Sequence, residues 1–131
     1  MVIDTSAIVS ILNDEPERQA FNEAIQNAAT CFLSAAAFVE ASIVMESSRG
    51  YDGLRDFDLF LATAGIQIVA VDEEQARIAR DAFRRFGKGR HAAGLNFGDC
   101  FSYALAKAIN QPLLFKGQDF PLTDIPPQPL A

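Results

Sequence analysis

The sequence has no tryptophan, a single histidine (His91) and only two cysteines, Cys31 and Cys100, among its 131 residues. Two cysteines in apolar surroundings form neither a disulfide framework nor a metal knuckle, and such residues are typical of small buried side chains. With one histidine and no pair of thiolates, the chain lacks the ligands that zinc prefers. The composition therefore argues against a disulfide scaffold and against a zinc site.

Long apolar runs are also missing, because polar residues interrupt each stretch before it reaches the roughly 20 residues that span a bilayer. The N-terminal segment MVIDTS has neither a basic region nor a cleavable apolar region. No repeat or low-complexity segment is visible, and only the final TDIPPQPLA is rich in proline. We expect a cytoplasmic protein with a single domain over residues 1–131, in which about 121–131 form a Pro-rich C-terminal extension.

Basic residues are scarce, with 11 Lys and Arg against 17 Asp and Glu, and the net charge of −6 argues at first against a nucleic-acid partner. Residues 1–76 hold 13 acids and 3 bases, a balance of −10, whereas residues 77–131 hold 4 acids and 8 bases, a balance of +4. Six of the bases lie within the fourteen positions 77–90. This run is either the solvated face of a helix or a patch that attracts phosphate groups, and the charge count leaves both open.

Short apolar segments alternate with helical patterns along the chain. Strands are expected at 1–4, 31–34, 66–71 and 112–115. Helices are expected at 6–13, 15–29, 35–50, 51–65, 72–86 and 98–110. This alternation predicts an α/β fold with a short parallel β-sheet covered by helices on both faces. In such folds, ligands gather at the carboxyl ends of the strands.

Four carboxylates lie at positions that suit a functional site. Asp4 follows the first strand, Asp99 opens the last long helix, and Asp119 follows the last strand. Glu40 lies within a helix, and its neighbours three and four positions away are all apolar. Burying a carboxylate is costly unless a positive or hydrogen-bonding group meets it.

Three of these acids also have simpler explanations. Asp4 and Asp99 are suited to capping a helix, and Asp119 is suited to a turn beside Gly117. The other interpretation is a shared site for Mg²⁺ or Mn²⁺, bound by one or two carboxylates directly and by others through water. One or two such ions activate a water and stabilise the leaving oxygen of a phosphodiester. Spacing alone leaves this choice open.

The segments MVIDTSAIVSIL, LNFGDCFSYALAK and LLFKGQDF, together with a mid-helix Glu40, resemble the PIN-domain ribonucleases. They resemble more closely the VapC-type toxins of bacterial toxin–antitoxin modules. The resemblance spans essentially the whole chain, and LNFGD combined with FKGQDF is its most specific part. It implies a three-layer α/β/α sandwich and a Mg²⁺- or Mn²⁺-dependent endoribonuclease.

The resemblance also assigns roles to particular residues. The family's catalytic acids correspond to Asp4, Glu40, Asp99 and Asp119, with Asp4 and Asp99 expected as direct metal ligands. The supporting polar residues, which orient a carboxylate or a bound water, correspond to Thr5, Ser6 and Asn96.

The partners that the resemblance implies are an RNA substrate, a second copy in a homodimer and an inhibitory antitoxin that lays an apolar segment along a groove. The candidate RNA-phosphate contacts are Arg84, Arg85, Lys88, Arg90, His91 and Lys116. The segment 51–65 carries more apolar side chains than one helix face needs, which favours a protein interface. The candidate antitoxin or dimer contacts are Phe38, Val39, Phe57, Leu59, Phe60 and Leu61.

Two alternatives remain open from the sequence. A phosphoacceptor receiver domain also has a parallel sheet, strand-end acids, Mg²⁺ and a late lysine, here Lys116. It needs an acidic pair after the first strand, where this chain has Asp4 alone. A non-catalytic PIN module that only binds RNA or protein is the second alternative, and the four filled acidic positions argue against it.

Overall fold

A computed structural model describes residues 1–130 and contains one parallel sheet of four strands in the order β3-β2-β1-β4. The strands are β1 (Val2–Ile3), β2 (Phe32–Ser34), β3 (Gln67–Val69) and β4 (Leu113–Leu114). The helices are α1 (Thr5–Leu12), α2 (Arg18–Asn27), α3 (Ala35–Ala64), α4 (Glu73–Phe86) and α5 (Phe97–Ala108), with a 3-10 turn η1 (Phe120–Leu122). Within residues 1–130, no helix combines the length and apolar character needed to cross a membrane.

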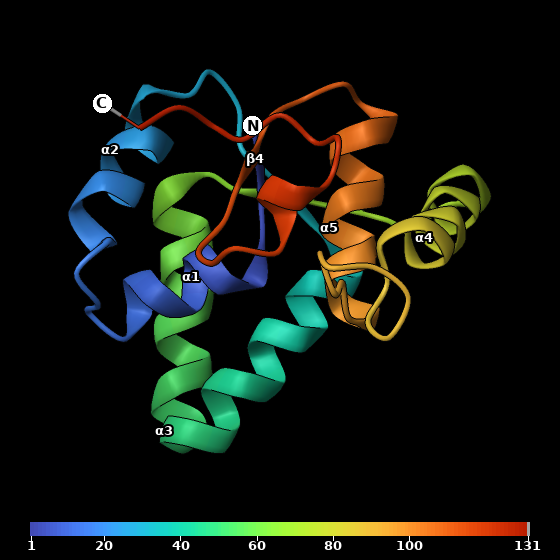
Figure 1. Ribbon diagram of the computed structural model, residues 1–131. Helices are drawn as coiled ribbons and strands as arrows, with labels where there is room; N and C mark the ends of the chain where they lie inside the picture. Colours follow the sequence, from blue (N-terminus) through green and yellow to red (C-terminus); the bar gives the residue numbers. More distant parts are fainter. Residues whose placement is uncertain (131) are drawn as a thin grey trace.

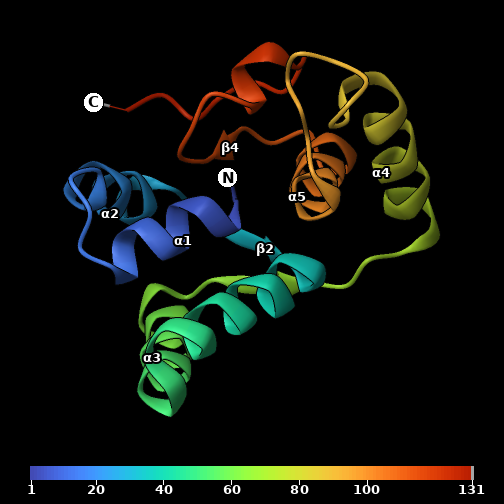
Figure 2. The same ribbon diagram turned by 60° about the horizontal axis from the view of Figure 1, so that its bottom comes forward.

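Helices cover both faces of the sheet, with α1, α2 and α3 on one side and α4 and α5 on the other (Figure 2). Neighbouring residues of a strand point to opposite faces. Accordingly, Ile3 packs into the apolar cluster shared with Phe57, whereas Val2 packs into the cluster shared with Leu105. The predicted three-layer α/β/α sandwich is confirmed.

The sheet brings together segments that are distant in the sequence. Val2 of β1 lies opposite both Phe32 of β2 and Leu113 of β4. Because all pairings are parallel, the carboxyl ends of the strands share one edge of the sheet. At this edge, Asp4 follows β1, helix α3 begins after β2, and the turn that carries Asp119 comes after β4.

Helix α3 consists of two helical halves that fold back on each other (Figure 1). Gly50, at the fold, has φ 61° and ψ −146°, a backbone conformation that is essentially restricted to glycine. The predicted boundary between helices 35–50 and 51–65 is therefore correct, although no loop separates the two halves.

The C-terminal segment, predicted as a Pro-rich extension, pairs with the last strand. Leu113 N–H donates to Pro126 O (3.0 Å) and Gln128 N–H donates to Leu113 O (2.9 Å), so this segment runs along the outer edge of β4. Ile125 is buried. Proline suits this place, because an edge position does not require an N–H donor. This segment is thus attached to the domain at Ile125 and along 126–128; residue 131 of the predicted extension lies outside the described residues.

Candidate active site

Asp4 is held firmly at the carboxyl end of β1, with 3% of its surface exposed. Its N–H donates to Leu114 O on β4 (2.9 Å). Its Oδ2 accepts hydrogen bonds from the N–H (3.0 Å) and the hydroxyl (2.6 Å) of Ser6. The capping explanation for Asp4 is therefore correct for α1. Both bonds go to the same oxygen, which leaves Oδ1 for another ligand.

Asp99 does not cap α5; the N-cap is Asn96, and Asp99 is the third residue of the helix. Asn96 Oδ1 accepts from Asp99 N–H (2.8 Å), and Asp99 Oδ2 accepts from Asn96 N–H (3.0 Å). This reciprocal pair is a capping box. It fixes the orientation of the Asp99 carboxylate, which is the kind of role expected for Asn96.

Glu40 projects from the first half of α3 toward the start of α5. A Cβ added to Gly98 would lie 2.0 Å from Glu40 Oε2, so the carboxylate rests against the backbone next to Asp99. The sequence-based prediction missed Gly98, although a glycine directly before the third acid was a usable signal. Glycine at this position leaves the space that the Glu40 carboxylate occupies.

The four acids act on one another electrostatically. The pKa of Asp99 is raised to about 6: burial is the largest cause, the hydrogen bond from Asn96 opposes it, and the charges of Asp4, Asp119 and Glu40 add to the rise. Asp119 is exposed at the start of η1. None of the salt bridges within residues 1–130 involves any of the four acids. Negative charge is therefore concentrated at this edge without a protein cation to balance it.

The donor set fits a hard divalent cation. In the described part of the chain, no group of three or more His, Cys, Asp or Glu side chains is arranged so that it could hold a metal ion. The fit therefore rests on donor chemistry: carboxylate oxygens are the ligands that Mg²⁺ prefers, and Mg²⁺ keeps several waters and takes only one or two carboxylates directly. Zinc, with its four close nitrogen or sulfur ligands, does not suit these donors.

The two hydroxyl residues after Asp4 have different contacts. Ser6 Oγ donates to Asp4 and accepts from the N–H of Lys116 (3.0 Å). Thr5 Oγ1 donates instead to Ala37 O on α3 (3.3 Å). Of the two candidates, Ser6 contacts the first acid, whereas Thr5 joins α1 to the helix that carries Glu40.

Lys116, an expected RNA contact, is paired within the protein. Its Nζ lies 2.7 Å from Glu15 Oε2 and 3.3 Å from Glu17 Oε2. The hydrogen bond to Glu15 raises the pKa of Lys116. Two carboxylates therefore compete with any phosphate for this ammonium group.

The predicted basic stretch divides into paired and unpaired residues. Arg84 and Arg85 lie 3.7 Å and 3.8 Å from the carboxylate of Asp81. His91 Nδ1 accepts from Ala93 N–H (3.0 Å), which places it in the turn after α4. These three residues therefore already have a partner within the protein.

Lys88 and Arg90 are the exposed cations of this stretch that have no salt bridge within residues 1–130. The Arg90 guanidinium lies 5.4 Å from the ring centroid of Phe83. Among the six predicted RNA contacts, these two are the most accessible to a phosphate.

The expected protein-interface residues also divide into two groups. Phe57 and Leu61 have 0% and 7% of their surface exposed, so their prediction as surface contacts is wrong. The second half of α3 folds back so that both side chains enter the core. Val39 and Leu59 are exposed, and Phe38 and Phe60 are partly buried.

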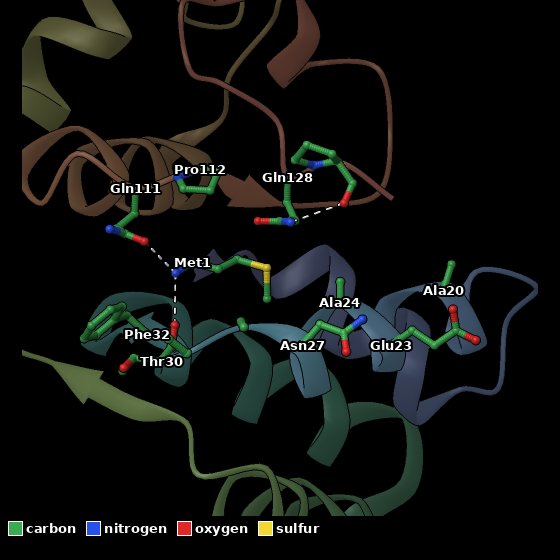
Figure 3. A pocket seen from close by; sticks show the side chains of 13 residues that line it. Met1, Ala20, Glu23, Ala24, Asn27, Thr30, Phe32, Gln111, Pro112 and Gln128 are labelled. Carbon is green, nitrogen blue, oxygen red and sulfur yellow. Dashed lines mark hydrogen bonds between the residues drawn. The ribbon is translucent and has the colours of Figure 1, made fainter. Parts of the chain in front are cut away.

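A hollow of about 430 Å³ lies at the other end of the sheet, beside the amino end of β1 (Figure 3). Its lining includes Met1, Asn27, Gln111 and Gln128, and Glu23 is its only acid. The Met1 amino group donates to Thr30 O (3.0 Å) and Gln111 Oε1 (2.8 Å). None of the four acids lines this hollow, so the candidate active site is identified by charge rather than by cavity volume.

The three-layer fold and its strand-end acids agree with a known class: a family model described as the PIN domain matches residues 1–126. The Ribonuclease VapC of Mycolicibacterium smegmatis is 55% identical over 125 residues, which are 95% of this chain and 97% of that protein. Ribonuclease VapC30 of Mycobacterium tuberculosis is 52% identical over 125 residues, 95% of each chain. The chain therefore belongs to the PIN-domain family and, within it, to the VapC ribonucleases.

The fold has further support from a solved structure. A toxin–antitoxin complex from Klebsiella pneumoniae matches with a TM-score of 0.70 at 16% identity, over 94% of this chain and 92% of that chain. Family membership sets the receiver-domain alternative aside. It leaves the non-catalytic PIN module to be tested by activity.

Proposed function

We propose that this protein is a Mg²⁺- or Mn²⁺-dependent endoribonuclease toxin that a cognate antitoxin inhibits. The observation that carries the proposal is the placement of acids from separate segments at one edge of the sheet: Asp4 is buried directly after β1, and the Glu40 carboxylate rests against Gly98, next to Asp99. The charges of Asp4, Asp119 and Glu40 also help to raise the pKa of Asp99. Such an accumulation of carboxylates calls for a bound cation. RNA hydrolysis is inferred from the relatives, which are named as ribonucleases, and implies action in the cytoplasm.

The residues have distinct proposed roles. Asp4 and Asp99 bind the cation directly, and Glu40 and Asp119 bind it directly or through water. When bound, one or two ions supply an activated water and stabilise the leaving oxygen of the phosphodiester. Ser6 and Asn96 each hold one carboxylate by hydrogen bonds, so the free oxygens face the edge of the sheet.

Cleavage of total RNA tests the proposal. Wild-type protein should cut RNA in the presence of Mg²⁺ or Mn²⁺, and this cleavage should stop when EDTA is added. Asp99→Asn should lose at least roughly 100-fold of the cleavage rate, because a direct ligand is removed. Asp58→Asn, at an exposed acid on α3, is the matched control and should retain activity. Cleavage that resists both EDTA and Asp99→Asn would contradict the mechanism, and no cleavage at all would favour the non-catalytic module.

The proposed antitoxin site is a hollow of about 340 Å³ between α1 and the second half of α3. Leu12, Leu59 and Phe60 contribute its apolar lining, and Arg49 and Asp56 lie at the same hollow. Leu59 has 65% of its surface exposed, which suits an apolar antitoxin segment. Leu59→Glu should weaken antitoxin binding in a calorimetric titration, whereas Leu122→Glu, at an exposed leucine on η1, should not.

The proposed homodimer has a different candidate surface. Phe97, Val39 and Ile43 have 78%, 54% and 59% of their surfaces exposed. Phe97 adjoins Gly98, which rests against Glu40, so these side chains lie around the contact between α5 and α3. Sedimentation should show a dimer for the wild type and a monomer for Ile43→Glu.

A further inference from the structure

One face of α5 carries Asp99, Tyr103 and Lys107, which follow one another at intervals of four residues. Asp99 lies at the acidic edge, and Tyr103 is buried with 2% of its surface exposed. The roles proposed above do not involve Tyr103 or Lys107. Both of these side chains nevertheless contact the same residue, Asp124 in the C-terminal segment.

Asp124 is held by three side chains. The Tyr103 hydroxyl donates to its Oδ1 at 2.5 Å, and Lys107 Nζ donates to its Oδ2 at 2.8 Å. Arg85 of α4 lies 3.7 Å from Oδ2. Burial raises the pKa of Asp124, but the hydrogen bonds from Lys107 and Tyr103 outweigh this effect and lower it overall. The carboxylate therefore stays ionised at neutral pH and keeps its three partners.

Asp124 and Asp119 belong to one short, internally bonded turn. Phe120, which follows Asp119, is buried and lies 5.2 Å from the ring of Phe115. The carbonyl of Phe120 accepts from both the N–H (2.9 Å) and the hydroxyl (2.7 Å) of Thr123. The Asp119 side chain makes no capping hydrogen bond on η1. Its backbone carbonyl accepts from Leu122 N–H (3.2 Å), so the turn that follows holds the main chain from which this carboxylate projects.

The same turn is anchored at its beginning. The N–H of Lys116 donates to Ser6 Oγ, and Ser6 Oγ donates to Asp4. One anchor therefore lies beside Asp4, and the other, at Asp124, is bonded to the helix that carries Asp99.

We propose that Tyr103 and Lys107 are positioning residues that hold Asp119 at the acidic edge through Asp124. One helix then supplies Asp99 directly and fixes the fourth carboxylate indirectly. The inference rests on the proposed function, because it concerns the divalent cation that the four acids are proposed to bind.

Direct titration with Mn²⁺, with free Mn²⁺ followed by electron paramagnetic resonance, tests this role without relying on activity. Tyr103→Phe removes only the hydroxyl and should weaken Mn²⁺ binding roughly tenfold, the usual effect of losing a group that orients a ligand. Tyr51→Phe is the matched control, because Tyr51 is the other tyrosine of the chain and has 85% of its surface exposed. It should bind Mn²⁺ as the wild type does.

A double-mutant cycle separates positioning of Asp119 from a general loss of structure. In an Asp119→Asn background, Tyr103→Phe should weaken Mn²⁺ binding no further, because the carboxylate that it positions is already gone. A merely structural effect would weaken binding equally in both backgrounds.

Lys107→Gln gives a second test at an exposed residue whose replacement leaves the core intact. Removing a cation near an acidic site would by itself strengthen Mn²⁺ binding. The positioning role predicts the opposite, a weakening, whereas Lys88→Gln should show no weakening.

Two results would overturn the inference while leaving the proposed function intact. The first is wild-type Mn²⁺ affinity in both Tyr103→Phe and Lys107→Gln, and the second is an equal loss with and without the Asp119 carboxylate. A wild-type protein that neither binds Mn²⁺ nor cuts RNA would overturn the proposed function as well.

Discussion

Asp99 shows at the residue scale how a functional site works against stability. Its pKa rises from 3.8 to about 6 on folding. Between these values the native state binds more protons than the unfolded state, so stability falls as the pH rises through this window. Above about pH 6 the full loss in the free energy of unfolding from the raised pKa of Asp99 is present. Without a bound cation, the native protein therefore carries an electrostatic penalty at neutral pH.

We therefore expect Asp99→Asn to be more stable than the wild type in EDTA at neutral pH. The gain in the free energy of unfolding should be about 3 kcal/mol, from the size of the pKa shift, and should vanish below about pH 4. Urea unfolding at several pH values measures it, with Asp58→Asn as the control. If the stability of the wild type relative to Asp99→Asn did not change with pH, the expected destabilisation by the ionised Asp99 carboxylate would be contradicted.

Two glycines offer a second test at the residue scale, because the same substitution meets different neighbours. In Gly98→Ala the new Cβ displaces the Glu40 carboxylate, the mobile end of a side chain, so RNA cleavage should fall roughly tenfold. Thermal stability should stay unchanged or rise, since alanine favours a helix. In Gly53→Ala the new Cβ would lie 2.3 Å from the backbone oxygen of Met45, so stability should fall. Cleavage rates should therefore show a loss of activity in Gly98→Ala, and melting curves should show a loss of stability in Gly53→Ala but not in Gly98→Ala.

At the element scale, two helix N-caps separate stability from activity. Asn96 caps α5 at the acidic edge, and Asp72 caps α4 by accepting from Gln75 N–H (2.8 Å). Replacing either residue by alanine should cost about 1 kcal/mol of unfolding free energy. Only Asn96→Ala should also reduce cleavage, by roughly tenfold or more, because it frees the Asp99 carboxylate. Equal cleavage by both variants would show that the capping box does not orient Asp99.

Most elements could be predicted from local patterns, and the misses have a physical cause. Strand alternation and the glycines at 50 and 65 located the helices, since both signals act within a few residues. The alternative of Asp99 as a helix cap is wrong because Asn96, three residues earlier, fills that position. Phe57 and Leu61 were misassigned because the direction in which a helix folds back depends on tertiary packing. The same limit hid the pairing of Lys116 with Glu15 and Glu17.

For the whole molecule, the uneven charge has a measurable consequence. Lys88 and Arg90 project from an acidic protein and have no salt bridge within residues 1–130. In an Asp99→Asn protein, which binds RNA without cutting it, Arg90→Ala or Lys88→Ala should lower the slope of log affinity against log salt by about one. Arg55→Ala, at an exposed arginine paired with Asp52, should leave the slope unchanged. An unchanged slope in every variant would show that Lys88 and Arg90 do not contact RNA phosphates.

The four acids could be named from the sequence because a family resemblance supplied their positions. Composition and spacing alone left Asp4, Asp99 and Asp119 explained equally well as caps and turns. Tyr103 and Asp124 were not predicted, since they are 21 residues apart and neither belongs to a recognisable motif. Contacts between distant segments are the part that local patterns do not specify.

The central strand β1 pairs with β4, whose residues lie more than a hundred positions further along the chain. Such a long separation raises the contact order and delays the closure of the sheet during folding. The ribosome must therefore synthesise β4 before this strand can dock beside β1 and bring Asp119 toward the other three proposed ligands. Translation products that stop before β4 consequently lack part of the proposed metal site.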